Sequence, residues 1–258
     1  IMTASSANTA IRPGVHTDHS TREAKTSIDW LRTGHTAVIT GAANGIGRAA
    51  AEIFLANGMQ VVIADNNAEA LAAAAEDLHA YQDRLEVMTC DVSNYAQVCR
   101  LRDRAFERFS CVDCLTNNAG AAVTRALPWD DLDGWKKQLD INLWGILHGC
   151  HAFVPALIAQ ERAATIINTG SKQGITNPPG GFAYNLSKAG VLNYTQSLAH
   201  ALRDQADANV TAHLLVPGFT YSNMIQRFIP TQPSGAWSTH QVVDFMLDSL
   251  TTGDFLIL

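Results

Sequence analysis

The sequence of 258 residues contains no cluster of lysine and arginine and no long uninterrupted apolar run. Its 18 basic residues are outnumbered by 24 acidic ones, which gives a formal net charge of −6. Proteins that bind nucleic acid usually carry a basic patch, and a membrane-spanning helix needs about 20 apolar residues. We therefore expect neither nucleic acid nor a membrane to be a partner of this chain.

Cysteine is also scarce, with five residues, an odd number. Residues 1–21 lack the apolar stretch of a secretion signal, so we expect reduced thiols and a cytoplasmic protein. Cys111 and Cys114 have CxxC spacing, but no second CxxC completes a zinc site. His148 and His151 lack a third ligand nearby. We assign structural roles to these four residues and predict no metal site.

Hydrophobic residues make up 47% of the chain, enough for a sizeable core. The length fits one large α/β domain better than two small ones. We assign residues 34–258 to this domain and residues 1–33 to an N-terminal arm. Within the arm, residues 22–32 are predicted to form a short amphipathic helix through Ile28, Trp30 and Leu31.

A strand, a glycine-rich turn and a helix follow one another at the start of the domain. The apolar strand 35–40 runs into Gly-Ala-Ala-Asn-Gly-Ile-Gly, and an alanine-rich helix continues to about residue 58. This order is what a dinucleotide-binding fingerprint requires, because the glycines allow a tight turn, close approach to a pyrophosphate and tight helix packing. The helix N-terminus adds free N–H groups. The predicted contacts are Gly41, Asn44, Gly45, Ile46 and Gly47.

The next strand, 60–64, ends on Asp65, and Asn66 follows it. A carboxylate at this position accepts hydrogen bonds from both ribose hydroxyls of adenosine and repels a 2′-phosphate. We therefore predict NAD as the cofactor and assign Asp65 and Asn66 to its site. Two alternatives stay open: Asp65 is a solvated residue at a strand end, or Arg48 after the glycine turn selects NADP.

Strands and helices keep alternating along the rest of the chain. We expect helices over 68–80, 94–109, 132–160, 184–203 and 239–250, and strands over 85–90, 112–116, 164–168, 210–216 and 255–258. Such alternation predicts βαβ units in a doubly wound parallel sheet, with ligands beyond the carboxyl ends of the strands. The irregular, apolar segment 219–237 is predicted to be a lid over that edge.

Tyr184 and Lys188 are four residues apart in a predicted helix, so their side chains share one face. An ammonium group beside a phenol favours the phenolate and is expected to lower the pKa of the tyrosine. Such a tyrosine can exchange a proton with a carbinol or carbonyl oxygen, which Ser171 can hydrogen-bond. The alternative is a simple surface pair at a helix N-terminus.

These residues together resemble the short-chain dehydrogenase/reductase family over about residues 35–258. The family pattern TGxxxGxG corresponds to Thr40–Gly47, and NNAG corresponds to Asn117–Gly120. The remaining motif residues occur in the family's order: Asn142, Ser171, Tyr184, Lys188 and the pair Pro217–Gly218. Two details depart from the pattern, since Gly170 replaces a commoner serine and Lys172 places a charge beside Ser171.

The resemblance implies a seven-stranded Rossmann fold and hydride transfer between a nicotinamide and a carbinol carbon. Tyr184 would be the acid and base, Lys188 would lower its pKa and hold the ribose, Ser171 would orient the substrate, and Asn142 would anchor a proton-relaying water. The resemblance also implies homodimers or homotetramers built on helices 132–160 and 184–203. Further cofactor contacts would be Asp91, Val92, Asn118, Ala119, Gly120, Pro217, Gly218 and Thr220.

The predicted function is therefore an NAD-dependent alcohol dehydrogenase or ketone reductase, and the apolar lid favours an apolar small-molecule substrate. A nearer alternative is an NADP-dependent carbonyl reductase of the same fold. A more distant one is a nucleotide-binding regulatory protein without turnover.

Overall fold

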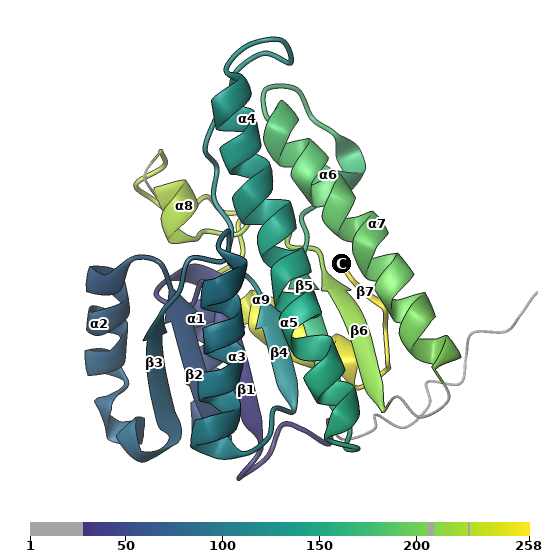
Figure 1. Cartoon of the computed structure of the whole chain (residues 1–258). Coiled ribbons are helices and arrows are strands. Elements are labelled where there is room, and N and C mark those ends of the chain that lie inside the picture. The colour runs from purple at the N-terminus through teal and green to yellow at the C-terminus, as the bar shows by residue number, and fades with distance from the viewer. Residues whose placement is uncertain (1–27, 206–208, 227) are drawn as a thin grey trace, which may run out of the picture.

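A computed structural model describes residues 28–205, 209–226 and 228–258. Its centre is a seven-stranded, all-parallel sheet with the strand order β3-β2-β1-β4-β5-β6-β7 (Figure 1). The order reverses between β1 and β4, which makes their carboxyl ends the switch point where ligands of such sheets bind. The predicted fold is confirmed. The strands are β1 (Thr36–Thr40), β2 (Gln60–Asp65), β3 (Leu85–Thr89), β4 (Cys114–Asn117), β5 (Ala164–Thr169), β6 (Val210–Leu215) and β7 (Leu256–Ile257).

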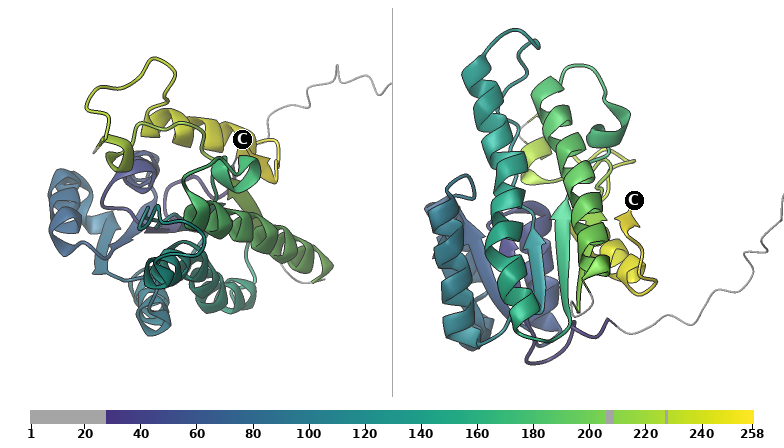
Figure 2. Two further views of the ribbon diagram at one scale, coloured as in Figure 1. Left: turned by 90° about the horizontal axis from the view of Figure 1, so that it is seen from above. Right: turned by 45° about the vertical axis from the view of Figure 1, so that its right-hand side comes forward.

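Helices cover both faces of the sheet, as the view from above shows (Figure 2). Each face has its own apolar core, because the parallel strands bury side chains on both sides. One layer consists of α1 (Gly45–Ala56), α2 (Ala68–Asp77) and α9 (Thr239–Leu250). The other contains α3 (Tyr95–Phe109), α5 (Gly145–Ala159) and α7 (Phe182–Asp204). Shorter helices are η1 (His79–Arg84), α4 (Leu132–Leu139), α6 (Gln173–Thr176) and α8 (Asn223–Gln226).

The predicted helix 132–160 contains a π-helical turn, η2 (Asp140–Trp144), between α4 and α5. A π-turn inserts one extra residue into a helix and often marks a functional site. By length and composition alone, the combined helix Leu132–Ala159 is long and apolar enough to cross a membrane. Core helices of soluble proteins meet the same criterion, and 44% of its most apolar window is buried here.

A buried carboxylate fastens the amino ends of the three central strands. Asp113, just before β4, accepts a hydrogen bond from the Thr36 amide at 2.8 Å and lies 2.6 Å from an Arg162 guanidinium nitrogen. His35 Nδ1 lies 3.3 Å from the same carboxylate. Removing one partner of such a buried pair strongly destabilises the folded protein. This contact therefore holds β1, β4 and β5 together at the ends opposite the switch point.

The two cysteines of the CxxC pair lie at the same ends of the strands. Cys114 is fully buried on β4, and burial raises the pKa of its thiol to about 12. Cys111 lies 3.8 Å from a carboxylate oxygen of Asp113. In the described residues no group of three or more His, Cys, Asp and Glu side chains could hold a metal ion.

Several element boundaries differ from the prediction. Helix α2 ends at Asp77, and the 3₁₀-helix η1 follows it where a continuous helix to residue 80 was expected. Of the predicted helix 22–32, residues 22–27 lie outside the described part, and residues 29–34 form turns and bends. Trp30 in this segment is 7% exposed because its ring packs edge-on against Phe54 of α1, with 5.4 Å between ring centroids.

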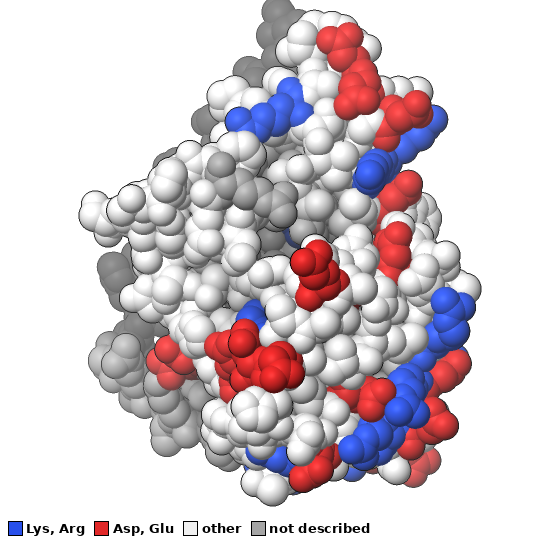
Figure 3. Space-filling view, turned by 90° about the vertical axis from the view of Figure 1, so that its left-hand side faces the viewer, with Lys and Arg blue, Asp and Glu red and all other residues white. Residues whose placement is uncertain are grey.

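Charged side chains of both signs are interspersed on the face shown in Figure 3. Arg104 of α3 pairs with Glu86 of β3 at 2.8 Å and with Glu107 at 2.9 Å. Arg102 pairs with Asp103 in the same helix. The positive charges of α3 are therefore largely compensated by neighbouring carboxylates.

Candidate active site

The turn after β1 has the backbone that a phosphate-binding loop needs. Gly41 and Gly45 have positive φ angles of 65° and 62°, which side chains other than glycine rarely tolerate. A Cβ on Gly41 would lie 2.7 Å from the Ala119 Cα, and one on Gly47 would lie 2.5 Å from the Gly41 carbonyl oxygen. A Cβ on Gly45 would meet the Ser222 side chain at 3.7 Å, an ordinary contact distance, so no backbone crowds this position. The turn can therefore admit a pyrophosphate at the N-terminus of α1.

Segment 219–237, the predicted lid, reaches this turn directly. Asn44, the N-cap residue of α1, makes no capping hydrogen bond with its side chain. Its Oδ1 accepts a hydrogen bond from Asn223 Nδ2 at 3.0 Å, and Asn223 begins α8. No motif spacing pointed to Asn223 or Ser222, because 179 residues separate Asn223 from its partner.

Asn118 connects the glycine turn to the neighbouring strands. Its Nδ2 donates to the carbonyl oxygens of Thr40 at 3.1 Å and Gly41 at 3.2 Å. Its Oδ1 accepts from Thr169 Oγ1 at 3.3 Å. The predicted contact residues Asn118 and Ala119 thus lie against the turn, and Asn118 fixes its position across β1, β4 and β5.

Asp65 lies at the end of β2, next to the same turn. One carboxylate oxygen accepts from the Ala43 amide at 3.2 Å and the other from the Asn67 amide at 3.0 Å. These two bonds fix the orientation of the carboxylate, as a ribose-binding role requires. Asn66 is exposed beside it.

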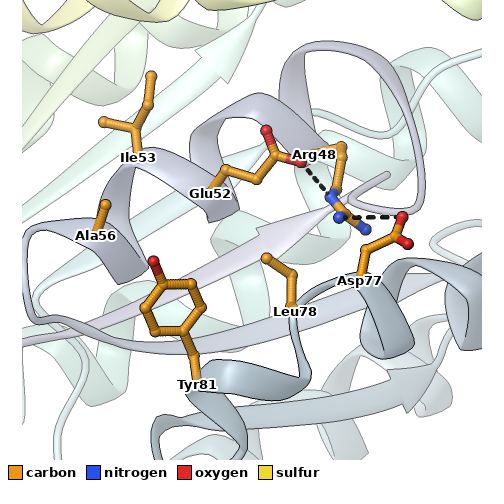
Figure 4. A pocket seen from close by; sticks show the side chains of 7 residues that line it. All are labelled: Arg48, Glu52, Ile53, Ala56, Asp77, Leu78 and Tyr81. Atoms are coloured by element: carbon orange, nitrogen blue, oxygen red, sulfur yellow. Dashed lines mark hydrogen bonds and ion pairs between the residues drawn. The ribbon is translucent and has the colours of Figure 1, made fainter.

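Arg48 is committed elsewhere. Its guanidinium pairs with Glu52 at 2.8 Å and Asp77 at 3.4 Å and donates to the Ala74 carbonyl at 2.7 Å (Figure 4). It lines an open pocket of about 600 Å³ between α1, α2 and η1. The side chain that could favour a 2′-phosphate therefore joins two helices.

Asp91 and Val92 follow β3 and are also partly engaged. One oxygen of Asp91 accepts from the amide and hydroxyl of Ser93, at 2.9 and 2.7 Å. Val92 is buried against Gly145, and its carbonyl oxygen lies 2.8 Å from His148 Nδ1. His148 thus has a local partner in the loop after β3.

The predicted catalytic residues Ser171, Tyr184 and Lys188 come together beyond β5. The Ser171 side chain lies near the Tyr184 phenol and acts to lower its pKa, and the Ser171 hydroxyl accepts a hydrogen bond from the Gln173 amide at 3.2 Å. Lys188 Nζ lies 5.9 Å from the centroid of the Tyr184 ring and donates to the Thr169 carbonyl at 2.8 Å. Helix α7 carries Tyr184 and Lys188 on one face, so the four-residue spacing works as predicted.

The pKa shift of Tyr184 is opposite to the predicted one. Burial of the phenol raises its pKa above the usual 10, although the nearby Ser171 side chain opposes this. Lys188 is buried, and desolvation lowers its own pKa to about 8. The prediction omitted desolvation, which acts against the charged form of both side chains.

Asn142 lies in the π-turn, and its side-chain amide forms hydrogen bonds with the loop after β4. Its Oδ1 accepts from the Ala121 amide at 2.8 Å, and its Nδ2 donates to the Ala121 carbonyl at 2.9 Å and to Ser187 Oγ at 3.4 Å. A Cβ on Gly120 would lie 3.5 Å from Asn142 and 3.6 Å from Lys188. Asn142, Gly120 and Lys188 are therefore neighbours. The water-anchoring role stays a prediction.

The loop after β6 supplies the opposite wall. The Pro217 carbonyl accepts from the Lys172 amide at 3.2 Å, which places it beside the Ser171 loop. Gly218 faces open space, while Thr220 is buried in a bridge with Trp237. Lys172 is exposed, so its charge is solvated beside Ser171.

Gln138 is a site residue that the sequence interpretation missed. It is fully buried four residues before Asn142 and binds the same loop, accepting from the Val123 amide at 2.7 Å and donating to the Ala121 carbonyl at 2.6 Å. A polar residue four positions from Asn142 in an apolar helix was a usable signal.

Comparisons with known proteins agree on one family. A family model described as short chain dehydrogenase matches residues 35–233. The chain is 36% identical over 193 residues to 3beta-hydroxysteroid dehydrogenase 2 of Eggerthella lenta, covering 74% of this chain and 73% of that protein. It is 34% identical to 2-(R)-hydroxypropyl-CoM dehydrogenase of Xanthobacter autotrophicus, covering 74% and 76%.

A crystal structure of a short chain dehydrogenase/reductase from Burkholderia phymatum in complex with NAD is similar as well. It superposes with a TM-score of 0.81 at 34% identity, covering 88% of this chain and 89% of that one. Levodione reductase has the same fold at a TM-score of 0.76 and 22% identity, over 87% and 95% of the two chains.

Proposed function

Because this chain belongs to the short-chain dehydrogenase/reductase family, a family of oxidoreductases, we propose that it interconverts a secondary alcohol and a ketone with NAD as cofactor. The observation that carries the proposal is that Ser171, Tyr184 and the buried Lys188 come together as one group. This group lies beyond the carboxyl end of β5, on the same sheet edge as the glycine turn. It combines a proton donor, a substrate-orienting hydroxyl and a cation.

The proton chemistry falls to Tyr184. In the reducing direction its phenol donates a proton to the ketone oxygen, and in the oxidising direction the phenolate takes the proton of the alcohol. With its raised pKa, the phenol keeps its proton at neutral pH, which is the form that reduction uses. For oxidation the Lys188 ammonium stabilises the phenolate, and Ser171 holds the substrate oxygen by a second hydrogen bond. The nicotinamide supplies or accepts the hydride when it is bound.

The residues around the glycine turn fit a dinucleotide. The positive φ angles of Gly41 and Gly45 suit a turn around a pyrophosphate, and Asp65 is oriented to accept ribose hydroxyls. The other residues assigned to the cofactor are Asn44, Ile46, Gly47, Asn66, Asp91, Val92, Asn118, Ala119, Gly120, Pro217, Gly218 and Thr220.

NAD is favoured over NADP by two observations on charge. The carboxylate of Asp65 would repel a 2′-phosphate, and Arg48 is engaged by Glu52, Asp77 and the Ala74 carbonyl. The similar enzyme from Burkholderia phymatum was crystallised with NAD.

An apolar substrate is supported by the lid. Phe219, Phe228, Ile229 and Trp237 all expose much of their side chains in segment 219–237. Exposed aromatic groups beside a catalytic centre are suited to bind a large apolar molecule. The similarity to a 3beta-hydroxysteroid dehydrogenase makes hydroxysteroids the first class to test.

We further propose a homodimer or homotetramer formed through α4–α5 and α7. Trp144 and Leu186, on the two parts of this surface, are 50% and 51% exposed. Large apolar and aromatic side chains such as these are suited to pack against a partner subunit. The five free cysteines suit a reducing, cytoplasmic compartment.

The experiment that tests the function follows the absorbance of NADH with hydroxysteroids, aryl carbinols and aliphatic secondary alcohols, each with NAD and NADP in parallel. Turnover with NAD on any class, lost in Tyr184→Phe, is the expected result. Faster turnover with NADP would favour the carbonyl-reductase alternative. Nucleotide binding by calorimetry without turnover on the whole panel would favour the regulatory alternative.

A further inference from the structure

Gln138 makes an unusual contact for a residue inside an apolar helix. Its side chain is 0% exposed, and both ends of its amide are used by the backbone of the loop after β4. Burying an amide is costly unless both its donor and its acceptor find partners. Here both partners belong to a single loop, so the contact works as a two-point attachment between α4 and residues 121–123.

This attachment lies next to the catalytic centre. The Ala121 carbonyl accepts from both Gln138 at 2.6 Å and Asn142 at 2.9 Å, and the two side chains are one helical turn apart. Gly120, immediately before Ala121, faces Lys188. A shift of this loop backbone would therefore move the chain that lies against Asn142 and Lys188.

The loop also reaches the lid. The Arg125 guanidinium lies 5.3 Å from the centroid of the Phe228 ring, a cation–π contact. At its other end the loop is fixed by Asp131, which accepts from Thr124 Oγ1 at 2.7 Å and from the Gly134 amide at 3.0 Å. Gln138 and Asp131 thus hold the two ends of the segment that meets the lid.

We propose that Gln138 is a positioning residue that sets the substrate-side wall of the active site by holding residues 121–123 against α4. The inference rests on the proposed function for its kinetic consequence, while the attachment itself can be measured without turnover. Gln138 is fully buried and its amide is bonded to the loop backbone, so its effect on the reaction passes through the loop.

The matched control is Gln160, which makes the same two-point contact at the opposite sheet edge. Its Oε1 accepts from the Val112 amide at 3.2 Å, and its Nε2 donates to the Val112 carbonyl at 2.7 Å. Gln138→Leu and Gln160→Leu each remove two hydrogen bonds and keep a side chain of similar volume. Both are expected to lose stability, which thermal unfolding measures, but only the first should affect the active site.

The test compares both variants with the unaltered protein by hydrogen exchange and by kinetics. We expect faster exchange in a peptide covering residues 119–126 for Gln138→Leu alone. We also expect its substrate KM to rise about 5- to 30-fold, with a smaller change in the NAD dissociation constant, because residues 121–123 lead directly to Arg125, which contacts Phe228 of the lid. In Gln138→Glu the protonated side chain restores the donor to the Ala121 carbonyl, so its KM should fall towards the original value as the pH is lowered.

Unchanged exchange over residues 119–126 in Gln138→Leu would overturn the inference, as would an equal rise in KM in Gln160→Leu. Should the unaltered protein bind NAD and turn over no substrate, the proposed function fails, yet the exchange comparison still decides whether Gln138 holds the loop.

Discussion

Tyr184 carries the acid–base step in the proposed mechanism, and its substitution by phenylalanine removes one oxygen atom. We expect Tyr184→Phe to lower kcat by roughly 10²–10⁴, the usual contribution of a positioned acid or base. Cofactor affinity, measured by calorimetry, should stay nearly constant because the ring is retained. Activity close to that of the unaltered enzyme would exclude Tyr184 as the proton donor.

Lys188 gives a stability prediction with a definite sign. Burial lowers its pKa to about 8, below the 10.5 of an exposed lysine, so between these values the unfolded chain binds more protons than the folded one. Stability linked to Lys188 therefore rises with pH from about 8 upward, by at most about 1.4 kcal/mol per pH unit.

Buried cysteines act in the opposite direction above pH 9, because burial raises the pKa of the Cys114 and Cys150 thiols to about 12. The comparison with Lys188→Met removes this background. Denaturant unfolding between pH 7.5 and about 9.5 should give a difference between the two proteins that shifts in favour of the unaltered one as the pH rises. A difference independent of pH would contradict the assigned pKa.

Asp65 is the residue on which the cofactor prediction depends. Replacing it by alanine removes the acceptor for the ribose hydroxyls and the repulsion of a 2′-phosphate. The ratio of kcat/KM for NAD over NADP should fall by about tenfold or more. If the ratio does not move, the carboxylate has only a structural role through the Ala43 and Asn67 amides.

For single residues, the sequence predicted which side chains form the site better than it predicted their pKa shifts. Gly41, Ser171, Tyr184 and Lys188 have positions that their motifs anticipated, because chemistry fixes those residue types at those spacings. The direction of the Tyr184 pKa shift was wrong because burial depends on the packed surroundings, which spacing does not reveal.

Among the contacts between helices, Arg48 joins α1 to α2 and also pairs within α1. Arg48→Met removes contacts to Glu52, Asp77 and the Ala74 carbonyl from a side chain that is 14% exposed. We expect the free energy of unfolding to drop by about 1–3 kcal/mol, with the NAD to NADP ratio unchanged. A marked gain or loss of NADP activity in this variant would assign Arg48 to the cofactor site instead.

The order and type of the main helices and strands followed from the alternation of apolar segments, and the boundaries were less predictable. The π-turn at Asp140–Trp144 was not predicted, since an apolar helix looks alike with or without one extra residue. Its position coincides with Asn142, whose contact with Ala121 comes from a loop about twenty residues earlier. Long-range contacts of this kind determine the local helix geometry, and they are not visible in the hydrophobic pattern of the sequence.

For the whole molecule, the proposed assembly can be tested at one position. Leu186→Glu places a charge on the exposed outer surface of α7, where the side chain is 51% exposed and makes little contribution to the monomer core. Light scattering coupled to gel filtration should show the unaltered protein as a dimer or tetramer and the variant as a monomer, with unchanged circular dichroism. Assembly that survives this substitution would place the interface elsewhere.

The amino and carboxyl ends of the parallel strands have different roles. This difference affects how such a protein can change during evolution. Asp113, Arg162 and Thr36 hold the central strands at the amino edge, with no share in the proposed chemistry. The loops at the other edge can then accumulate substitutions while the fold persists. Substitutions in these loops can change the substrate range because contacts at the amino ends of the same strands keep the fold stable.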